Sequence, residues 1–232
     1  MIKVMIDPGH GSGSANKGLS GYYEYDGVWK ISVYLKELLA EKGIRADLTK
    51  NWDQDPELYA RGQKAKGYDL FISEHTNANN GAARGVEVFY DYSKPQDELF
   101  AEKLAGNIAA VMGNPNRGAK TRVYTEGGKI YNYYGIIRSA SATDCKHIFL
   151  VENGFHDNPV DEAFLKFDEN LKMIAQTQAE TIFEIMSVKD MTVQEAEKIV
   201  REKADLDGNT MKYLRFYRYG ESLLLKLAKA MN

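Results

Sequence analysis

The sequence predicts an α/β sandwich followed by a small all-α C-terminal module, and three observations support this fold class. Short β-rich runs alternate with amphipathic stretches over most of the chain. From about residue 188 onward, only short helical patterns remain. The 232 residues also exceed the roughly 100 to 200 that one domain commonly uses, which favours one sizeable domain plus an appendage.

The main domain is expected to begin in βαβαβ order. In chain order we expect a strand at 2–6, a helix at 27–39, a strand at 45–49, a helix at 58–66 and a strand at 70–74. A further strand at 85–90, a helix at 98–112 and a buried strand at 148–151 follow. Strands and helices that alternate in this way build a layered α/β domain.

A helix start is expected at Asn158-Pro159, because Asn suits the N-cap, Pro suits the first helical position, and acidic residues follow in the first turn. A long helical pattern then covers 171–186, and we place the domain boundary at Ser187. The prediction is therefore a main domain at 1–187 and a helical module at 188–232.

Three helical patterns make up the module, at 193–203, 211–219 and 222–230. Nine Lys and Arg against seven Asp and Glu give it a net charge of 9 − 7 = +2. The leucines between 223 and 227 are interpreted as helix-packing residues. Because about 45 residues are marginal for independent folding, we expect the module to pack on the main domain, to self-associate or to be a very small binding module.

The composition of the chain narrows the range of functions that it can have. A formal net charge of -3 and a pI near 5.9 argue against nucleic-acid binding, which needs a dominant basic face. The single cysteine, Cys145, rules out an internal disulfide and fits synthesis in a reducing cytosol. The chain shows neither a signal-peptide pattern nor an apolar run of the roughly 18 to 20 residues that a membrane span needs. We expect cytoplasmic synthesis, and another route of exit if the substrate is extracellular.

Two histidines come at the ends of predicted strands. His10 lies in Asp-Pro-Gly-His-Gly directly after the first strand, and His75 follows the apolar strand at 70–74. Because the carboxyl ends of strands in α/β folds commonly open onto a site, we expect both at one sheet edge. The alternatives are a plain turn with an exposed His10 and a surface histidine at a strand end.

Two glutamates complete the candidate site. Glu24 lies just before the helix at 27–39, where an acidic residue often serves the helix dipole instead. Glu152 ends the buried strand, where a carboxylate is costly without hydrogen bonds, a metal or a raised pKa. Two histidines and a glutamate from separate loops match a three-ligand catalytic zinc site whose fourth position holds water. A nearby carboxylate then serves as general base and acid, which suits Glu152.

In this order and spacing, the motifs Asp-Pro-Gly-His-Gly, Ser-x-His-x-Asn-Ala and Val-Glu-x-Gly-Phe resemble those of zinc-dependent N-acetylmuramoyl-L-alanine amidases of the amidase-3 type, over residues 1–187. The resemblance implies a twisted, mostly parallel sheet flanked by helices, and one Zn²⁺ per chain bound by His10, Glu24 and His75. It also implies that Glu152 is the catalytic acid and base. The implied reaction is hydrolysis of the amide between N-acetylmuramic acid and L-alanine in peptidoglycan.

The missing signal peptide and the added helical module resemble a clostridial or other Gram-positive phage endolysin, which reaches the cell wall once a holin opens the membrane. A bacterial autolysin and a spore-lytic amidase are alternatives with the same chemistry. A zinc peptidase acting on the stem peptide is a different enzyme class. A wall-binding protein with a vestigial metal site is a non-enzymatic alternative.

Other polar residues near the motifs are weaker candidates. Asn77, Arg117 and Asn153 are candidates for substrate contacts or for support of the site, although each equally suits hydrogen bonding to its own loop backbone. His156 is a candidate for substrate contact or oxyanion stabilisation. Glu74 departs from the resembled family, and because side chains alternate along a strand we expect it to face solvent, opposite His75.

Two further features are interpreted as structural. His147 precedes an apolar strand, and we expect it to be structural or exposed. The tyrosine-rich stretch 131–134 is expected to pack in the core or on the surface, with a glycan-binding groove as the alternative.

Overall fold

The computed structural model describes residues 2–187, 193–217 and 220–231. The chain divides into two compact units, Met1–Ile185 and Met186–Asn232, and each has its own hydrophobic cluster. The boundary that we predict at Ser187 adjoins residues 188–192, which lie outside the described residues.

A six-stranded sheet forms the first unit, in the order β2-β1-β3-β8-β4-β5. Its strands are β1 (Lys3–Pro8), β2 (Arg45–Leu48), β3 (Leu70–Asn77), β4 (Val86–Tyr90), β5 (Asn116–Lys120) and β8 (His147–Phe155). Neighbouring strands are parallel except β4 and β8, which run antiparallel. The predicted mostly parallel sheet is therefore confirmed. Its central strands β3 and β8 are apolar and buried at their starts, as strands covered on both faces must be.

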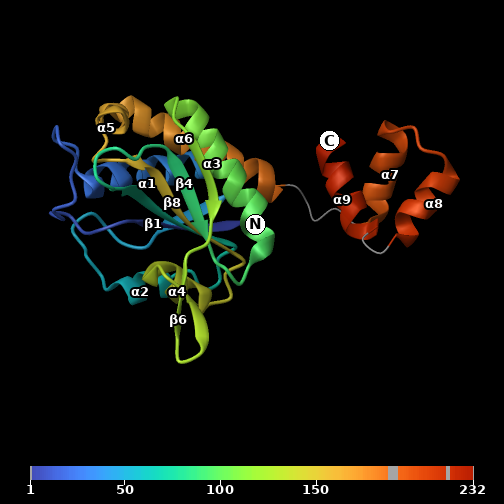
Figure 1. Cartoon of the computed structure of the whole chain (residues 1–232), viewed down its shortest axis with the longest axis horizontal. Coiled ribbons are helices and arrows are strands. Elements are labelled where there is room, and N and C mark those ends of the chain that lie inside the picture. Colours follow the sequence, from blue (N-terminus) through green and yellow to red (C-terminus); the bar gives the residue numbers. More distant parts are fainter. Residues whose placement is uncertain (1, 188–192, 218–219, 232) are drawn as a thin grey trace. The chain divides into compact units, whose positions relative to one another are not determined.

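Helices cover both faces of the sheet, as Figure 1 shows. The helices α1 (Glu24–Glu41), α3 (Glu98–Met112), α5 (Pro159–Leu165) and α6 (Asp168–Ser187) lie on one side, and α2 (Leu58–Gln63) and α4 (Gly135–Ser141) lie on the other. A single 3-10 turn, η1 (Pro95–Asp97), precedes α3. None of the described helices combines the length and apolarity required for crossing a bilayer.

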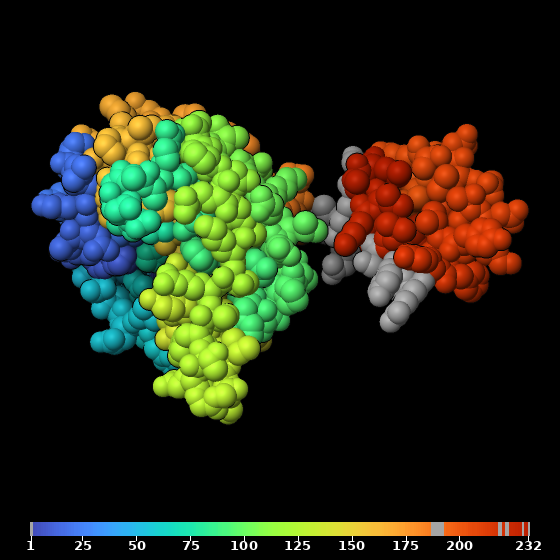
Figure 2. Space-filling view, in the orientation of Figure 1, coloured from blue at the N-terminus to red at the C-terminus, as the bar shows by residue number. Residues whose placement is uncertain are grey.

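Several elements of the first unit were not predicted. Strand β5 has the sequence Asn-Arg-Gly-Ala-Lys, which has no apolar run because it lies at the sheet edge. Strands β6 (Val123–Glu126) and β7 (Lys129–Asn132) form a separate hairpin closed by two glycines with positive φ, and the rings of Tyr124 and Tyr131 stack across it. The hairpin projects on the side of α2 and α4 (Figures 1 and 2).

The second unit consists, in its described part, of helices α7 (Val193–Lys203), α8 (Gly208–Phe216) and α9 (Gly220–Met231). Its buried residues Ala196, Val200, Leu224 and Ala228 bring α7 and α9 together. Leu225 and Leu227 pack against this cluster, which confirms the helix-packing role expected for these leucines. The predicted end of the middle helix at Tyr219 lies outside the described residues.

The predicted start of α5 is confirmed, and it provides a test of the fold. Asn158 is the N-cap, and its Oδ1 accepts hydrogen bonds from the backbone nitrogens of Val160 at 3.0 Å and Asp161 at 3.4 Å. We expect Asn158→Ala to lower the free energy of unfolding by about 1 to 2 kcal/mol, measured by urea denaturation. Asn158→Ser keeps a cap oxygen and, like Ala, lacks the amide that donates to the Gly81 and Ala82 carbonyls, so it should lose less than Ala. Equal losses in the two variants would contradict the capping role.

Candidate functional site

The candidate residues gather toward the carboxyl ends of β1, β3 and β8. The two central strands extend further than predicted, so His75 and Glu152 lie within β3 and β8 and not beyond them. His75 is the register partner of Glu152, and Glu87 of β4 pairs with Glu152 from the other side. Because directly paired residues point to the same sheet face, these three side chains share one face.

His10, Glu24 and His75 form a compact group in which one ligand atom from each residue lies within 4.8 Å of the others. Glu24 lies between the histidines: its Oε2 is 3.2 Å from His10 Nε2 and its Oε1 is 3.1 Å from His75 Nδ1. Glu24 is buried, whereas the His10 side chain is 33% exposed. The group is therefore anchored inside the protein and open to solvent on the His10 side.

This donor set fits a zinc ion. Two imidazole nitrogens and one carboxylate oxygen are a set that zinc takes in catalytic sites. Tetrahedral ligands at about 2.0 to 2.1 Å from a metal lie about 3.3 Å from one another. Each carboxylate oxygen of Glu24 lies near that spacing from one histidine, Oε2 from His10 at 3.2 Å and Oε1 from His75 at 3.1 Å.

The loop after β1 is shaped to deliver His10. A Cβ atom at Gly9 would lie 2.5 Å from His75 Cε1, so the backbone passes His75 at a distance that only glycine permits. His10 itself has a φ of 56°, in the left-handed region that non-glycine residues rarely adopt. The Lys50 ammonium donates a hydrogen bond to the His10 carbonyl and holds this conformation.

Glu24 is ionised and held from several directions. Burial by itself raises its pKa, but hydrogen bonds with His10 and His75 outweigh burial and hold the pKa well below its usual range. The backbone N–H of Thr76 donates to Oε1 at 3.0 Å, and Asn16 Nδ2 donates to Oε2 at 2.9 Å. Asn16 was missed from the sequence because it lies in a Gly-Ser-rich loop without periodicity, and only the return of this loop to α1 shows its role.

Glu152 is a buried carboxyl that lacks full hydrogen bonding. The residue is 7% exposed, and its Oε2 has no hydrogen-bond partner among the described residues. Burial, together with repulsion from Glu24 and Glu87, raises the pKa of Glu152 well above its usual range. A carboxyl group of this kind exchanges a proton more readily near neutral pH than an exposed glutamate does.

A cavity of about 520 Å³ opens beside the triad of His10, Glu24 and His75, between α2 and α4. His10, His75, Leu150, Arg61 and Tyr134 contribute to its wall. Within the stretch 131–134, Tyr134 thus reaches the cavity and also packs against the core, while Tyr133 is largely exposed. The packing expected for this stretch is confirmed for Tyr134, which in addition borders the site.

Asp7 of the Asp-Pro-Gly-His-Gly motif anchors the strand that leads to His10. It is fully buried and accepts hydrogen bonds from Thr49 Oγ1 at 2.6 Å and Ser73 Oγ at 2.7 Å. Arg61 Nε lies 3.4 Å from its Oδ1. At Asp7, three residues before His10 in the chain, these contacts join β1 to β3, to α2 and to the residue that follows β2.

Asn77 and Arg117 both bind Glu87. Asn77 Nδ2 donates to Oε1 at 2.8 Å, and Arg117 Nε donates to Oε2 at 2.7 Å, while the Lys120 ammonium also contacts Oε2. Burial raises the pKa of Glu87, but the bonds from Arg117 and Lys120 prevail and lower it. Arg117 and Lys120 therefore keep an ionised carboxylate beside Glu152, and Asn77 adds a hydrogen bond to it.

Asn153 and His156 lie away from the cavity. Asn153 is fully buried, and its Nδ2 donates to Glu74 Oε2 at 2.7 Å and to the His75 carbonyl at 3.3 Å. His156 Nδ1 lies 3.0 Å from both Oγ1 and the carbonyl of Thr76, the residue whose N–H holds Glu24. His147, expected to be structural, bonds through Nδ1 to Asp97 Oδ1 at 2.7 Å.

The prediction that Glu74 faces solvent was wrong. Glu74 does point away from His75, as alternation requires, but helix α6 covers that face of the sheet and Glu74 is fully buried. Burial raises its pKa to about 7 even though Gln178 and Asn153 hydrogen-bond to it. The error came from assigning solvent to a face that a later helix covers.

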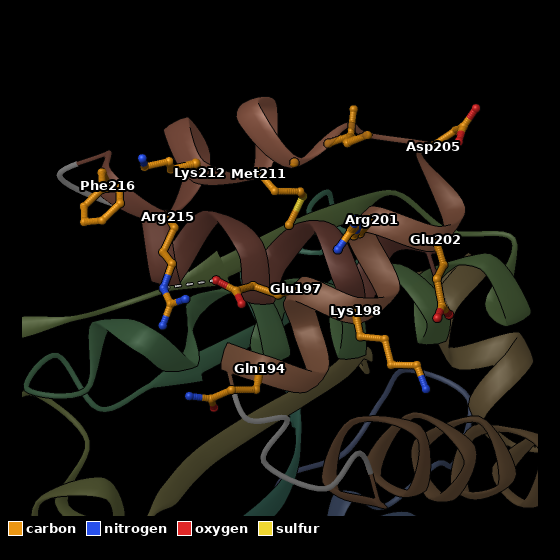
Figure 3. Close-up of a pocket in the computed structure, with 12 residues that line it drawn as sticks. Gln194, Glu197, Lys198, Arg201, Glu202, Asp205, Met211, Lys212, Arg215 and Phe216 are labelled. Carbon is orange, nitrogen blue, oxygen red and sulfur yellow. Dashed lines mark ion pairs between the residues drawn. The ribbon is translucent and has the colours of Figure 1, made fainter.

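The helical unit carries a separate groove of about 920 Å³ between α7 and α8, shown in Figure 3. Its lining mixes both charges and includes an ion pair in which Arg215 Nε lies 3.4 Å from Glu197 Oε1. On α8, Tyr213 and Phe216 are 80% and 77% exposed. Exposed aromatic rings beside a charged groove are typical of a binding surface.

Comparison with known proteins identifies relatives of this chain. The profile of the family described as N-acetylmuramoyl-L-alanine amidase matches residues 4–184. The endolysin of Bacillus phage SPP1 is 32% identical over 212 residues, which cover 89% of this chain and 73% of that protein. The sporulation-specific N-acetylmuramoyl-L-alanine amidase of Bacillus subtilis is 25% identical, over 82% of this chain and 70% of its own length.

Solved structures give the same result. The catalytic domain of CwlV, an N-acetylmuramoyl-L-alanine amidase from Bacillus (Paenibacillus) polymyxa var. colistinus, superposes with a TM-score of 0.68 at 27% identity. The alignment covers 82% of this chain and 100% of that domain. The relationship therefore spans the sheet and its helices.

The raised pKa of Glu152 predicts a pH-dependent stability. In the metal-free protein, Glu152→Gln should have no effect on stability at low pH, where the folded and unfolded states both hold the Glu152 proton. Above the unfolded pKa of about 4.3, Glu152 loses its proton in the unfolded chain but keeps it in the folded protein. The parent therefore loses stability as the pH rises, whereas Glu152→Gln does not. The variant should gain up to about 1 to 3 kcal/mol relative to the parent.

Urea denaturation at a series of pH values measures this gain, with Glu126→Gln in the exposed hairpin as the matched control. If the free energy of unfolding of Glu152→Gln equals that of the parent at every pH, the pKa of Glu152 is not raised in the folded protein.

Proposed function

This chain belongs to the N-acetylmuramoyl-L-alanine amidase family, and we propose that it hydrolyses the amide between N-acetylmuramic acid and L-alanine in peptidoglycan with one zinc ion per chain. One observation carries the mechanism: two histidines and a glutamate converge within 4.8 Å, the register partner of one histidine is a buried, incompletely paired carboxyl, and both histidines line a cavity. A vestigial metal site would have lost at least one of these groups, which argues against a protein that only binds the wall.

In this proposal His10, Glu24 and His75 hold the metal. A bound zinc ion polarises the scissile carbonyl and makes a water molecule more acidic. Glu152 accepts a proton from the attacking water and returns it to the departing L-alanine amine.

The cavity wall supports substrate binding at the same edge. Tyr134 and Leu150 offer apolar surface, and Arg61 offers a cation, although Asp7 already balances it. A peptidase that recognises the free carboxylate of a stem peptide needs an unbalanced cation, so this wall favours the amidase over the peptidase.

The biological setting stays a proposal with two forms. Likeness to a phage endolysin supports a lytic role at the cell wall after release from the cytoplasm, and likeness to a sporulation-specific amidase supports a bacterial role in wall remodelling. The helical unit is proposed to assist by wall recognition or by self-association, on the basis of its groove and its exposed rings.

Product analysis tests the reaction. Purified protein incubated with peptidoglycan should release new L-alanine amino termini and no new reducing sugars, and a zinc chelator should suppress the release until zinc is restored. New termini from other residues would indicate the peptidase, and absence of any product would indicate a binding protein.

Two variants separate the roles within this experiment. Glu152→Ala should lower turnover by about 10² to 10⁴ while zinc content is retained. His75→Ala should lose the metal, measured by elemental analysis after dialysis. Full zinc content in His75→Ala would remove this residue from the ligand set.

Deleting the helical unit tests its role. A chain that ends at Ser187 should cleave soluble wall fragments normally, because the triad, Glu152 and the cavity all belong to the first unit. Its affinity for intact walls should fall at least about tenfold if the helical unit binds the wall itself or joins two chains into a dimer. Sedimentation with walls and analytical ultracentrifugation distinguish these two, and unchanged results in both would defeat the proposal.

A further inference from the structure

A cluster of three buried polar side chains lies on the far side of the sheet from the cavity. Glu74 comes from β3, Asn153 from β8 and Gln178 from α6, and all three are fully buried. On the strands, Glu74 and Asn153 both come after an apolar run. Each is also the sequence neighbour of a residue of the proposed site. Glu74 precedes His75, and Asn153 follows Glu152.

The three side chains form a closed set of hydrogen bonds. Asn153 Nδ2 donates to Glu74 Oε2 at 2.7 Å, and Gln178 Nε2 donates to the same oxygen at 3.1 Å. Gln178 Nε2 also donates to Asn153 Oδ1 at 3.1 Å. One strand, its neighbour and the covering helix are therefore joined at a single point.

The cluster lies where the β3 to β8 ladder is interrupted. The register is regular up to His75 and Glu152, but the next partners are Asn77 and Phe155, so β8 carries an extra residue there. Asn153 lies in this bulge, and its Nδ2 donates to the His75 carbonyl at 3.3 Å. A side-chain amide thus contacts the backbone of β3 where regular pairing ends.

Not every polar atom of the cluster has a hydrogen-bond partner among the described residues. Burying a carboxyl and two amides is costly, and Oε1 of Glu74 and Oε1 of Gln178 have no hydrogen-bond partner among the described residues. Apolar side chains of similar volume commonly match or exceed the stability of such buried polar groups. The benefit of the cluster therefore lies in the geometry that it imposes more than in stability.

From these contacts we propose that Glu74, Asn153 and Gln178 are positioning residues that fix His75 and Glu152 relative to each other across the bulge. The proposal rests on the function proposed above for His75 and Glu152. Positioning groups behind a metal ligand commonly change metal affinity or activity by about 10- to 100-fold. The cluster has no contact with the cavity, so it acts on catalysis and metal binding, and not on substrate affinity.

Two substitutions of Glu74 test the proposal. Glu74→Leu removes the acceptor shared by Asn153 and Gln178, and we expect kcat to fall about 10- to 100-fold with KM within about twofold of the parent. Glu74→Gln retains an acceptor oxygen at this place and should restore kcat to within about threefold. Zinc affinity by chelator competition and the visible spectrum of the cobalt-substituted protein should change in Glu74→Leu and return in Glu74→Gln.

A matched control comes from the same helix. Thr181 is buried on α6 about one turn from Gln178, and its Oγ1 accepts from Asn107 Nδ2 of α3 at 2.8 Å and donates to the Thr177 carbonyl at 2.8 Å, outside the cluster. Thr181→Val should change the free energy of unfolding but leave kcat, zinc affinity and the cobalt spectrum unchanged. Should Glu74→Leu fail to fold, Gln178→Leu removes two of the three bonds of the cluster from the helix side.

The outcomes separate this proposal from the proposed function. A folded Glu74→Leu or Gln178→Leu protein with parental kcat, zinc affinity and cobalt spectrum would overturn the positioning role and leave the amidase intact. A parent that binds no zinc and releases no L-alanine termini would instead overturn the function on which the role depends.

Discussion

The pairing of β3 with β8 is the constraint on which the site depends. Because His75 and Glu152 are register partners on neighbouring parallel strands, their side chains share a face and a depth. A slip by one residue on either strand would turn one of the two toward α6. The remaining site residues are brought to this pair by loops and by the start of α1, which are easier to adjust than the register of a central strand.

The site brings three buried carboxyl groups together, and their surroundings shift their pKa values in different directions. Glu24 is ionised between two histidines, and Glu87 is ionised by hydrogen bonds from Arg117 and Lys120. Glu152 has neither kind of partner, so burial and then repulsion from Glu24 and Glu87 raise its pKa. The environment therefore assigns different protonation states to similar side chains, which is how acid and base roles are separated in enzyme sites.

Local patterns predicted most of the first unit. Apolar runs and helical spacing indicated β1, β3, β8, α1 and α3, and the Asn-Pro signal predicted the start of α5. The hairpin β6 and β7 and the edge strand β5 escaped because exposed strands carry no apolar alternation. Asn16 escaped for a related reason: its partners Glu24 and His10 are set by the path of a loop and not by any local period.

By itself the sequence determined the α/β class and the buried strands that carry His75 and Glu152, because their apolar runs break abruptly into polar residues. The convergence of His10 and Glu24 with His75 was implied by the resemblance to a known family, since each position alone also suited a structural role. Only the tertiary structure decided which face of the sheet each residue occupies and what covers that face. Glu74 shows the reason: alternation gave its direction correctly, but whether that direction meets water or helix α6 depends on packing between segments a hundred residues apart.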